Sequence, residues 1–179
     1  MTTITFQMSS RKQALIIALL LVFAWQARAQ TSETPSIKRN ELKIDVAYLI
    51  GSALKMEYEY FLNDWSSIGI VGLYNFGSSE NQIYKAQALG KYRLFFGKQT
   101  MSGFFLEGNF GVTSGKTLHM IYPRLEYTAF GAGIALGCKW HIPKSNVVMD
   151  VFGGLGRLFG KHYTAEVYPR VGICVGKRF

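Results

Sequence analysis

Apolar and polar residues alternate with a period of two through most of the chain. The segment Ala53–Leu62 shows this most clearly, because every even position from 54 to 62 is apolar or aromatic, whereas Lys55, Glu57 and Glu59 lie between them. Successive side chains of a strand point to opposite faces, so the pattern predicts a strand with one apolar and one charged face. Helical periodicity is not evident after the N-terminal region. The alternation predicts eight strands: Glu41–Ile50, Ala53–Leu62, Ser66–Phe76, Ile83–Phe96, Ser102–Thr113, Leu125–Trp140, Val147–Arg157 and Glu166–Phe179.

The connections between these strands alternate in length, apart from an unusually short first connection near Gly51. Short turns on one end and longer loops on the other are typical of an up-and-down antiparallel barrel in the outer membrane. With a periplasmic N-terminus, the longer set would face outside. The short turns lie near Asn63, Gly97 and Pro143, and the longer loops near Ser78, Thr117 and Lys161.

The N-terminal region has the three parts of a secretory signal peptide. Arg11 and Lys12 precede an apolar run from Ala14 to Trp25, and Ala27 and Ala29 form a cleavage site. The run is short of the ~20 apolar residues that a membrane-spanning helix needs. We therefore expect a signal peptide at residues 1–29, a flexible periplasmic leader at residues 30–40 and a barrel at residues 41–179.

The last predicted strand ends on Phe179, and Val175, Ile173 and Val171 share its face. In an outer-membrane barrel the last strand pairs with the first and closes the sheet. A terminal aromatic residue then lies at the membrane boundary. Lys177 departs from this pattern, because it occupies a place where an apolar residue is usual.

These observations predict an all-β, eight-stranded antiparallel up-and-down transmembrane β-barrel, localised to the bacterial outer membrane. The alternative is a soluble β-sandwich or lipocalin-like barrel, which shares the alternation but points its apolar face inward. The export signal and the terminal aromatic residue favour the membrane barrel. The topology also predicts two aromatic belts. One consists of Trp65, Phe96, Phe104, Trp140 and Phe179, and the other of Tyr48, Tyr74, Tyr84, Tyr127 and Tyr168.

The charged face of the strands should point into the lumen. An eight-stranded interior is just wide enough to be filled by side chains, and unpaired charges there would be costly, so these residues should form ion pairs. The turn centred near Gln99 predicts that Lys91 faces Glu107, because both are equidistant from it, with Arg93 as the diagonal alternative. The predicted network consists of Asp45, Lys55, Glu57, Glu59, Lys91, Arg93, Glu107, Lys139, Asp150 and Arg170.

The full chain of 179 residues has 20 Lys and Arg against 11 Asp and Glu. Three of the basic residues belong to the signal peptide, and the mature chain is still basic. Anionic lipid headgroups are a simpler partner for this charge than nucleic acid, which we do not expect to bind. The basic residues expected against the phosphates of the outer leaflet are Lys116, Arg124, Arg157 and Lys161.

Motifs that could carry chemistry are weak. Gly111–Thr117 resembles a phosphate-binding loop that is one residue short, and no helix is expected after it. His162, Thr164 and Glu166 could form a hydrolytic site in an outer loop, although their closeness in sequence does not make a site. Cys138 and Cys174 fall on opposite strand faces and are expected to be free thiols. We expect no catalytic site, no cofactor and no metal.

The chain resembles the small eight-stranded outer-membrane barrels of the OmpA/OmpX type. It is most similar to a Bacteroidetes outer-membrane barrel family known only as a domain of unknown function. The resemblance covers Asn40 to Phe179, and it implies no catalytic residues. It implies, through genes near surface fimbrial systems, a role in surface assembly. It rests on the segments Asn40–Lys43, Glu57–Leu62, Asp64–Ser66, Lys91–Arg93 and Gly176–Phe179.

The expected function is therefore that of a non-enzymatic barrel with a plugged, charge-paired lumen, either structural or supporting surface or fimbrial assembly. Its expected partners are outer-membrane lipids and lipopolysaccharide, the barrel assembly machinery during insertion, and surface or fimbrial proteins. The alternatives are a lipid A-modifying hydrolase that uses His162, Thr164 and Glu166, and a small pore.

Overall fold

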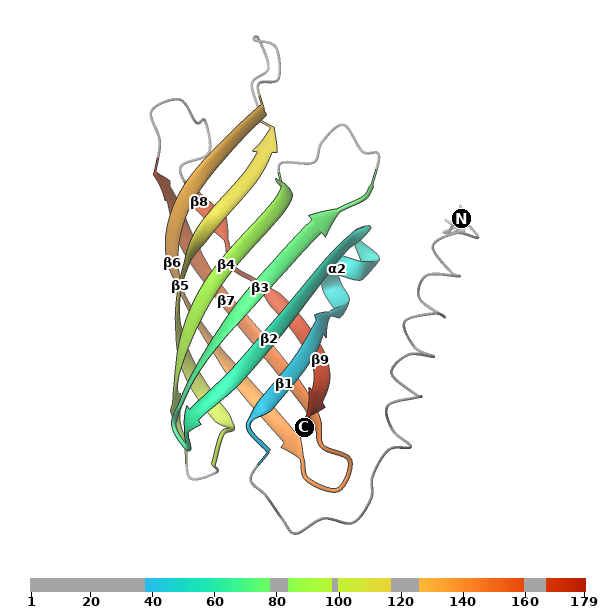
Figure 1. The fold of residues 1–179 in the computed structure, drawn as a ribbon, viewed down its shortest axis with the longest axis vertical. Coiled ribbons are helices and arrows are strands. Elements are labelled where there is room, and N and C mark those ends of the chain that lie inside the picture. Colours follow the sequence, from blue (N-terminus) through green and yellow to red (C-terminus); the bar gives the residue numbers. More distant parts are fainter. Residues whose placement is uncertain (1–37, 78–83, 98–99, 117–125, 160–166) are drawn as a thin grey trace, which may run out of the picture. The chain divides into compact units, whose positions relative to one another are not determined.

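A computed structural model of the chain describes residues 38–77, 84–97, 100–116, 126–159 and 167–179. The predicted signal peptide and most of the predicted leader lie outside these ranges. The described residues form one antiparallel sheet in which consecutive strands pair, except the last two, which both pair with the strand before them (Figure 1). Its elements are β1 (Asn40–Asp45), α2 (Val46–Ile50), β2 (Ala53–Asn63), β3 (Ser66–Asn75), β4 (Tyr84–Phe96), β5 (Gly103–Lys116), β6 (Glu126–Ile142), β7 (Val147–Phe159), β8 (Val167–Pro169) and β9 (Gly172–Arg178).

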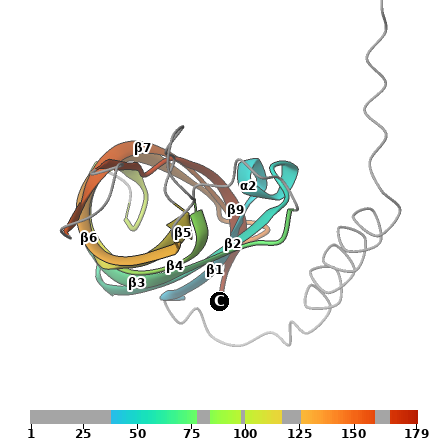
Figure 2. The same ribbon diagram turned by 90° about the horizontal axis from the view of Figure 1, so that it is seen from above.

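The sheet closes on itself through its first and last strands. β1 pairs with β9 from Glu41 opposite Arg178 to Asp45 opposite Cys174. The backbones of Asn40 and Phe179 complete the closure, with N–O distances of 3.2 and 2.8 Å. Viewed along its axis, the sheet forms a ring (Figure 2). β8 and β9 both pair with β7, so they are two parts of one strand interrupted at Arg170 and Val171. The fold is thus a closed, eight-stranded, up-and-down barrel, as predicted.

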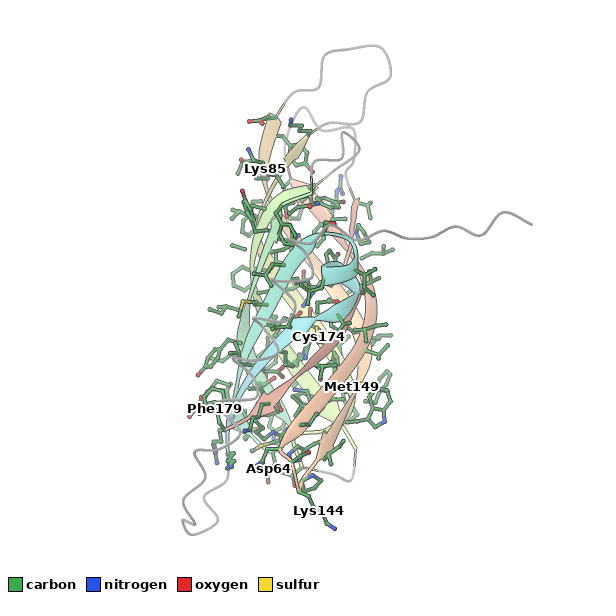
Figure 3. All side chains as sticks on the ribbon, turned by 90° about the vertical axis from the view of Figure 1, so that its right-hand side faces the viewer. Asp64, Lys85, Lys144, Met149, Cys174 and Phe179 are labelled. Atoms are coloured by element: carbon green, nitrogen blue, oxygen red, sulfur yellow. The ribbon has the colours of Figure 1, made fainter. Side chains whose placement is uncertain are left out.

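The two ends of the barrel differ. The turn after Asn63, the turn before Val147 and the chain end at Phe179 lie at one end, which we call the turn end. The opposite end, where β3, β5 and β7 finish, we call the loop end. Figure 3 shows Asp64 and Lys144 at the turn end and Lys85 toward the loop end.

The first strand is shorter than predicted. The alternation suggested a strand to Ile50, but β1 ends at Asp45 and the chain forms the single helical turn α2. The Asp45 carboxylate accepts hydrogen bonds from the backbone N–H groups of Ala47 and Tyr48, at 3.1 and 3.4 Å. Aspartate in extended conformation is a favourable helix N-cap, and here the cap overrides the alternating pattern. The prediction of no helix after the signal peptide was therefore wrong at this turn.

The register of β4 and β5 also differs from the prediction. Arg93 lies opposite Glu107, and Lys91 lies opposite Asn109. The connection is longer than the predicted turn, because β5 begins only at Gly103 and Met101 turns its side chain into the barrel, where it is buried. Met101 has a positive φ of 56° and its N–H donates to the Asp64 carbonyl. This inward fold shifts the pairing by two positions, so the predicted Lys91–Glu107 pair was wrong.

Candidate functional site

The inward faces of the strands carry a cluster of charged side chains, which we call the lumen network. All ten residues predicted from the sequence are buried: Asp45, Lys55, Glu57, Glu59, Lys91, Arg93, Glu107, Lys139, Asp150 and Arg170. Three further buried charges, Glu41, Lys43 and Arg178, belong to the same cluster. Their strand phase could have identified them, because Glu41 and Lys43 alternate with apolar residues in step with Asp45, and Arg178 shares the phase of Arg170.

The centre of the network is a pair of cations that share two carboxylates. Arg93 lies within 2.6 Å of Asp150 and 3.0 Å of Glu59 through Nη1. Lys43 Nζ lies 2.6 Å from the same Asp150 oxygen and also donates to Glu59. The Nε of Arg93 reaches Glu107 Oε2 at 2.7 Å. Four strands, β1, β2, β4 and β7, together with β5 through Glu107, are therefore tied across the lumen.

A second group lies on the loop side of this centre. Glu57 accepts from Lys91 at 2.6 Å and from Arg170 at 2.9 Å. The Nε of Arg170 also donates to Glu107 Oε1 at 2.8 Å, so Glu107 joins two arginines. Beyond it, the Tyr168 hydroxyl donates to Asn109 Oδ1 at 2.6 Å. Arg170 thus connects the interrupted last strand to β2 and β5.

A third group joins the first and last strands at the turn end. Glu41 Oε1 accepts from the Nε and Nη2 of Arg178, at 2.8 and 2.6 Å. Glu41 Oε2 accepts from Lys139 at 2.6 Å. The Nη2 of Arg178 also donates to the Met101 carbonyl at 2.7 Å. The backbone at Met101, just before β5, is in this way held against the closing strands.

Lys55 joins the two irregular points of the wall. Its Nζ donates to Asp45 Oδ2 at 2.8 Å and to the carbonyl of Val171 at 2.9 Å. Val171 lies in the interruption between β8 and β9, and Asp45 is the residue that ends β1. The Lys55 ammonium also lies 4.4 Å from the centre of the Tyr48 ring in α2.

Aromatic rings lie against the cations of the lumen network. Arg93 stacks over Phe105 at 4.2 Å, Arg170 over Phe152 at 4.5 Å and Lys139 over Phe61 at 4.7 Å. A cation over a ring face is attracted by the ring quadrupole, and this attraction grows when water is excluded. Phe61, Phe105 and Met101 are almost fully buried, so the turn end of the lumen is packed with apolar side chains.

The charges of the network nearly balance. In the described part of the chain, seven buried cations face six buried carboxylates: Lys43, Lys55, Lys91, Arg93, Lys139, Arg170 and Arg178 against Glu41, Asp45, Glu57, Glu59, Glu107 and Asp150. Removing charges from water costs several kcal/mol per ion unless partners and hydrogen bonds compensate. Such an arrangement of paired charges from different strands holds the strands in a fixed relation.

Of the two predicted aromatic belts, the first lies on the outer surface of the barrel and most of the second does not. Trp65, Phe96, Phe104, Trp140 and Phe179 are all about half exposed on the outer surface at the turn end. At the loop end, Tyr127 and Tyr168 point inward and are buried, with Tyr84 packed against them. Only Tyr74 of the five predicted tyrosines is strongly exposed. The second belt was therefore wrong in composition; the outer surface there carries Phe130 and Phe159, whose rings stack at 6.3 Å.

The other candidate sites from the sequence are the hydrolase residues, the phosphate-loop resemblance and the two cysteines. The residues of the hydrolase alternative, His162, Thr164 and Glu166, lie outside the described residues. Gly111–Lys116, the described part of the phosphate-loop resemblance, is extended strand in β5. Among the residues that the structure describes, no cluster of His, Cys, Asp and Glu is arranged to hold a metal. Cys174 lies inside, and Cys138 lies opposite Val151, an outward residue, so both thiols are free on opposite faces.

Comparisons with protein-family models, curated proteins and solved structures each returned no match. In the described ranges, no helix has the length and apolar character needed to cross a membrane.

Proposed function

We propose that the protein is an integral β-barrel of the bacterial outer membrane, exported by a cleaved signal peptide, with a non-enzymatic role. The distribution of side chains carries the proposal. Thirty large hydrophobic side chains are exposed on the described surface, whereas thirteen charged side chains are buried inside. A soluble barrel would have the opposite arrangement, because soluble monomers rarely expose large contiguous apolar patches. Lipid is the environment in which this arrangement is stable.

The closed hydrogen bonding of the backbone also supports the proposal that the barrel lies in lipid. A bilayer offers no hydrogen bonds to an open sheet edge, so a membrane sheet must be closed. Here the seam between β1 and β9 is paired over five residue pairs, from Glu41–Arg178 to Asp45–Cys174. The aromatic residues around the turn end, including Trp65 and Trp140, would then lie at the boundary between lipid and water.

Expression of the full chain in a Gram-negative host tests membrane insertion. We expect the mature protein in the outer-membrane fraction, beginning at Gln30, and soluble only with detergent. On a gel, the unheated barrel should migrate differently from the boiled chain, because a closed barrel resists detergent until heated. A mature protein that stays in the periplasmic extract and needs no detergent would contradict the proposal.

The lumen network supports a structural role more than a transport role. Arg93 and Arg170 reach across the interior to carboxylates of other strands, and the rings of Phe105 and Phe152 lie against them. An eight-stranded barrel has room for side chains but not for a wide channel. We propose that the closed interior makes the barrel a rigid platform, whose partners are outer-membrane lipids and lipopolysaccharide, the barrel assembly machinery during insertion, and surface or fimbrial proteins.

Planar-bilayer recording tests whether the lumen conducts. The wild-type barrel should show no stable openings of large conductance, because the ion pairs around Arg93 and the rings at the turn end obstruct the path. Lys85→Gln, which changes an outward-facing residue, should behave in the same way and serves as the control. Stable, ion-selective openings of the wild-type protein would instead support the small-pore alternative.

A further inference from the structure

The outer surface of β6, β7 and β8 carries a shallow apolar groove near the loop end, with a volume of about 480 Å³. Ala132 and the backbone of Gly133 and Gly156 form its floor, and its other lining residues are Ile134, Leu155, Arg157 and Val167. Ile134 and Leu155 are directly paired across β6 and β7, and their side chains are 67% and 63% exposed. They are among the most exposed hydrophobic residues of the described barrel.

The inward packing of Tyr168 accounts for Gly156, and the close approach of the Gly156 backbone accounts for Gly133. A Cβ atom on Gly156 would lie 2.0 Å from the Tyr168 ring, and one on Gly133 would lie 2.6 Å from the Gly156 Cα atom. The ring therefore fills the inside of the wall where the two glycines pair. On the outside, Ala132 projects only a methyl group between the larger side chains around it. The groove therefore follows from the small outward side chain of Ala132 between its larger outward neighbours.

The groove has one polar end. Arg157 points outward, opposite Ala132 on β6 and Val167 on β8. Because β7 runs toward the loop end, Arg157 lies two residue pairs closer to that end than Leu155, and Ala132 lies closer to it than Ile134. The Arg157 guanidinium is therefore at the loop end of the groove. The exposed pair Ile134 and Leu155 lies nearer the middle of the barrel. A membrane lipid has the same polarity, with an anionic headgroup above its acyl chains.

We propose that this groove binds one acyl chain of a phosphorylated lipid of the outer leaflet, with the lipid phosphate at Arg157. This inference rests on the proposed membrane insertion and deepens it, because it assigns a specific lipid site in place of general attraction. A long arginine side chain can reach the headgroup level while its stem covers apolar surface. Each methylene that the lipid buries in the groove adds to the attraction, and the guanidinium can donate a charge-assisted hydrogen bond to a phosphate.

Titration of nanodisc-inserted barrel with bisphosphorylated lipid A, followed by native mass spectrometry, tests this site. Ala132→Leu should fill the groove, and Arg157→Gln should remove the cation; each is expected to weaken retention of one lipid molecule roughly tenfold. The matched controls are Ala88→Leu, an outward alanine on β4, and Lys85→Gln, an outward cation at the same end of the barrel. Both controls should bind like wild type. Dephosphorylated lipid A should be affected by Ala132→Leu and not by Arg157→Gln.

The outcomes separate this inference from the proposed function. If all variants insert into nanodiscs but Lys85→Gln weakens binding as much as Arg157→Gln, the attraction is general and the site is refuted, whereas membrane insertion stands. Equal binding by Ala132→Leu and wild type would also refute the site. Failure of the wild-type chain to insert would overturn the membrane barrel and the site together. Inorganic phosphate should not compete, because it lacks the acyl chain.

Discussion

Replacing Glu107 with alanine is expected to lower the free energy of unfolding by about 3–5 kcal/mol. Glu107 accepts from Arg93 at 2.7 Å and from Arg170 at 2.8 Å, and all three side chains are buried. Among the residues that the structure describes, the interior already has one cation more than it has carboxylates. Loss of Glu107 doubles that excess and leaves two guanidinium groups with fewer partners. Urea unfolding of the barrel in lipid vesicles, followed by tryptophan fluorescence, measures the change.

A surface ion pair supplies the control for this experiment. Lys85 and Glu126 lie 3.8 Å apart and are both more than half exposed, so Glu126→Ala should cost about 1 kcal/mol or less. The double variant Glu107→Ala, Arg93→Met removes one charge of each sign and keeps the original excess. It should therefore be more stable than the sum of the two single losses implies. Additive losses, or a cost for Glu107→Ala no larger than for Glu126→Ala, would show that the network does not act as a unit.

The strands could be predicted because two different environments face the two sides of the sheet. An apolar exterior and a charged interior force a strict alternation, and this signal is strong in β2, where Lys55, Glu57 and Glu59 all point inward. The same phase would have included Glu41, Lys43 and Arg178 in the lumen network. It would also have placed Tyr127 and Tyr168 inside, since Tyr168 lies between the outward residues Val167 and Pro169. Height along the barrel alone does not determine which face a tyrosine occupies.

Other features depend on contacts that alternation does not encode. The end of β1 depends on the Asp45 carboxylate, whose Oδ1 caps α2 while its Oδ2 accepts a hydrogen bond from Lys55. The register of β4 and β5 depends on Met101, whose burial is possible only once the closed barrel provides a pocket at the turn end. The Asp45 cap is a local contact, and the burial of Met101 joins segments far apart in the chain. An alternating pattern contains no information about either of them.

The lumen network also explains how an interrupted wall can remain closed. β1 stops at Asp45 and the last strand is broken at Arg170 and Val171, so the ladder between these strands covers only part of the barrel height. Side chains replace the missing backbone pairs: Lys55 donates to the Val171 carbonyl, and Arg170 donates to Glu57 and Glu107. The stability of the closing seam should therefore depend on buried charges more than that of the regular hairpins does.

Glu41→Ala tests that dependence at the other end of the seam. Glu41 is fully buried and accepts from Arg178 and Lys139, and it sits directly opposite Arg178 in the pairing of β1 with β9. Removal of the carboxylate should cost about 3–5 kcal/mol, because it leaves two buried cations with fewer partners. The loss should be local, so amide hydrogen exchange is expected to accelerate in β1 and β9 before it does in β4 and β5. The temperature at which the folded gel band disappears should fall.

Glu41→Gln keeps the shape and one acceptor oxygen and should recover part of the loss, since Arg178 can still donate to an amide carbonyl. Glu126→Ala again removes a glutamate of the same barrel from an exposed pair, and it should leave the exchange rates of β1 and β9 unchanged. If Glu41→Ala instead accelerated exchange equally in all strands, the seam would share one cooperative unit with the hairpins. If it changed neither exchange nor the gel transition, the backbone pairing from Glu41 to Asp45 would be sufficient to close the barrel without its ion pairs.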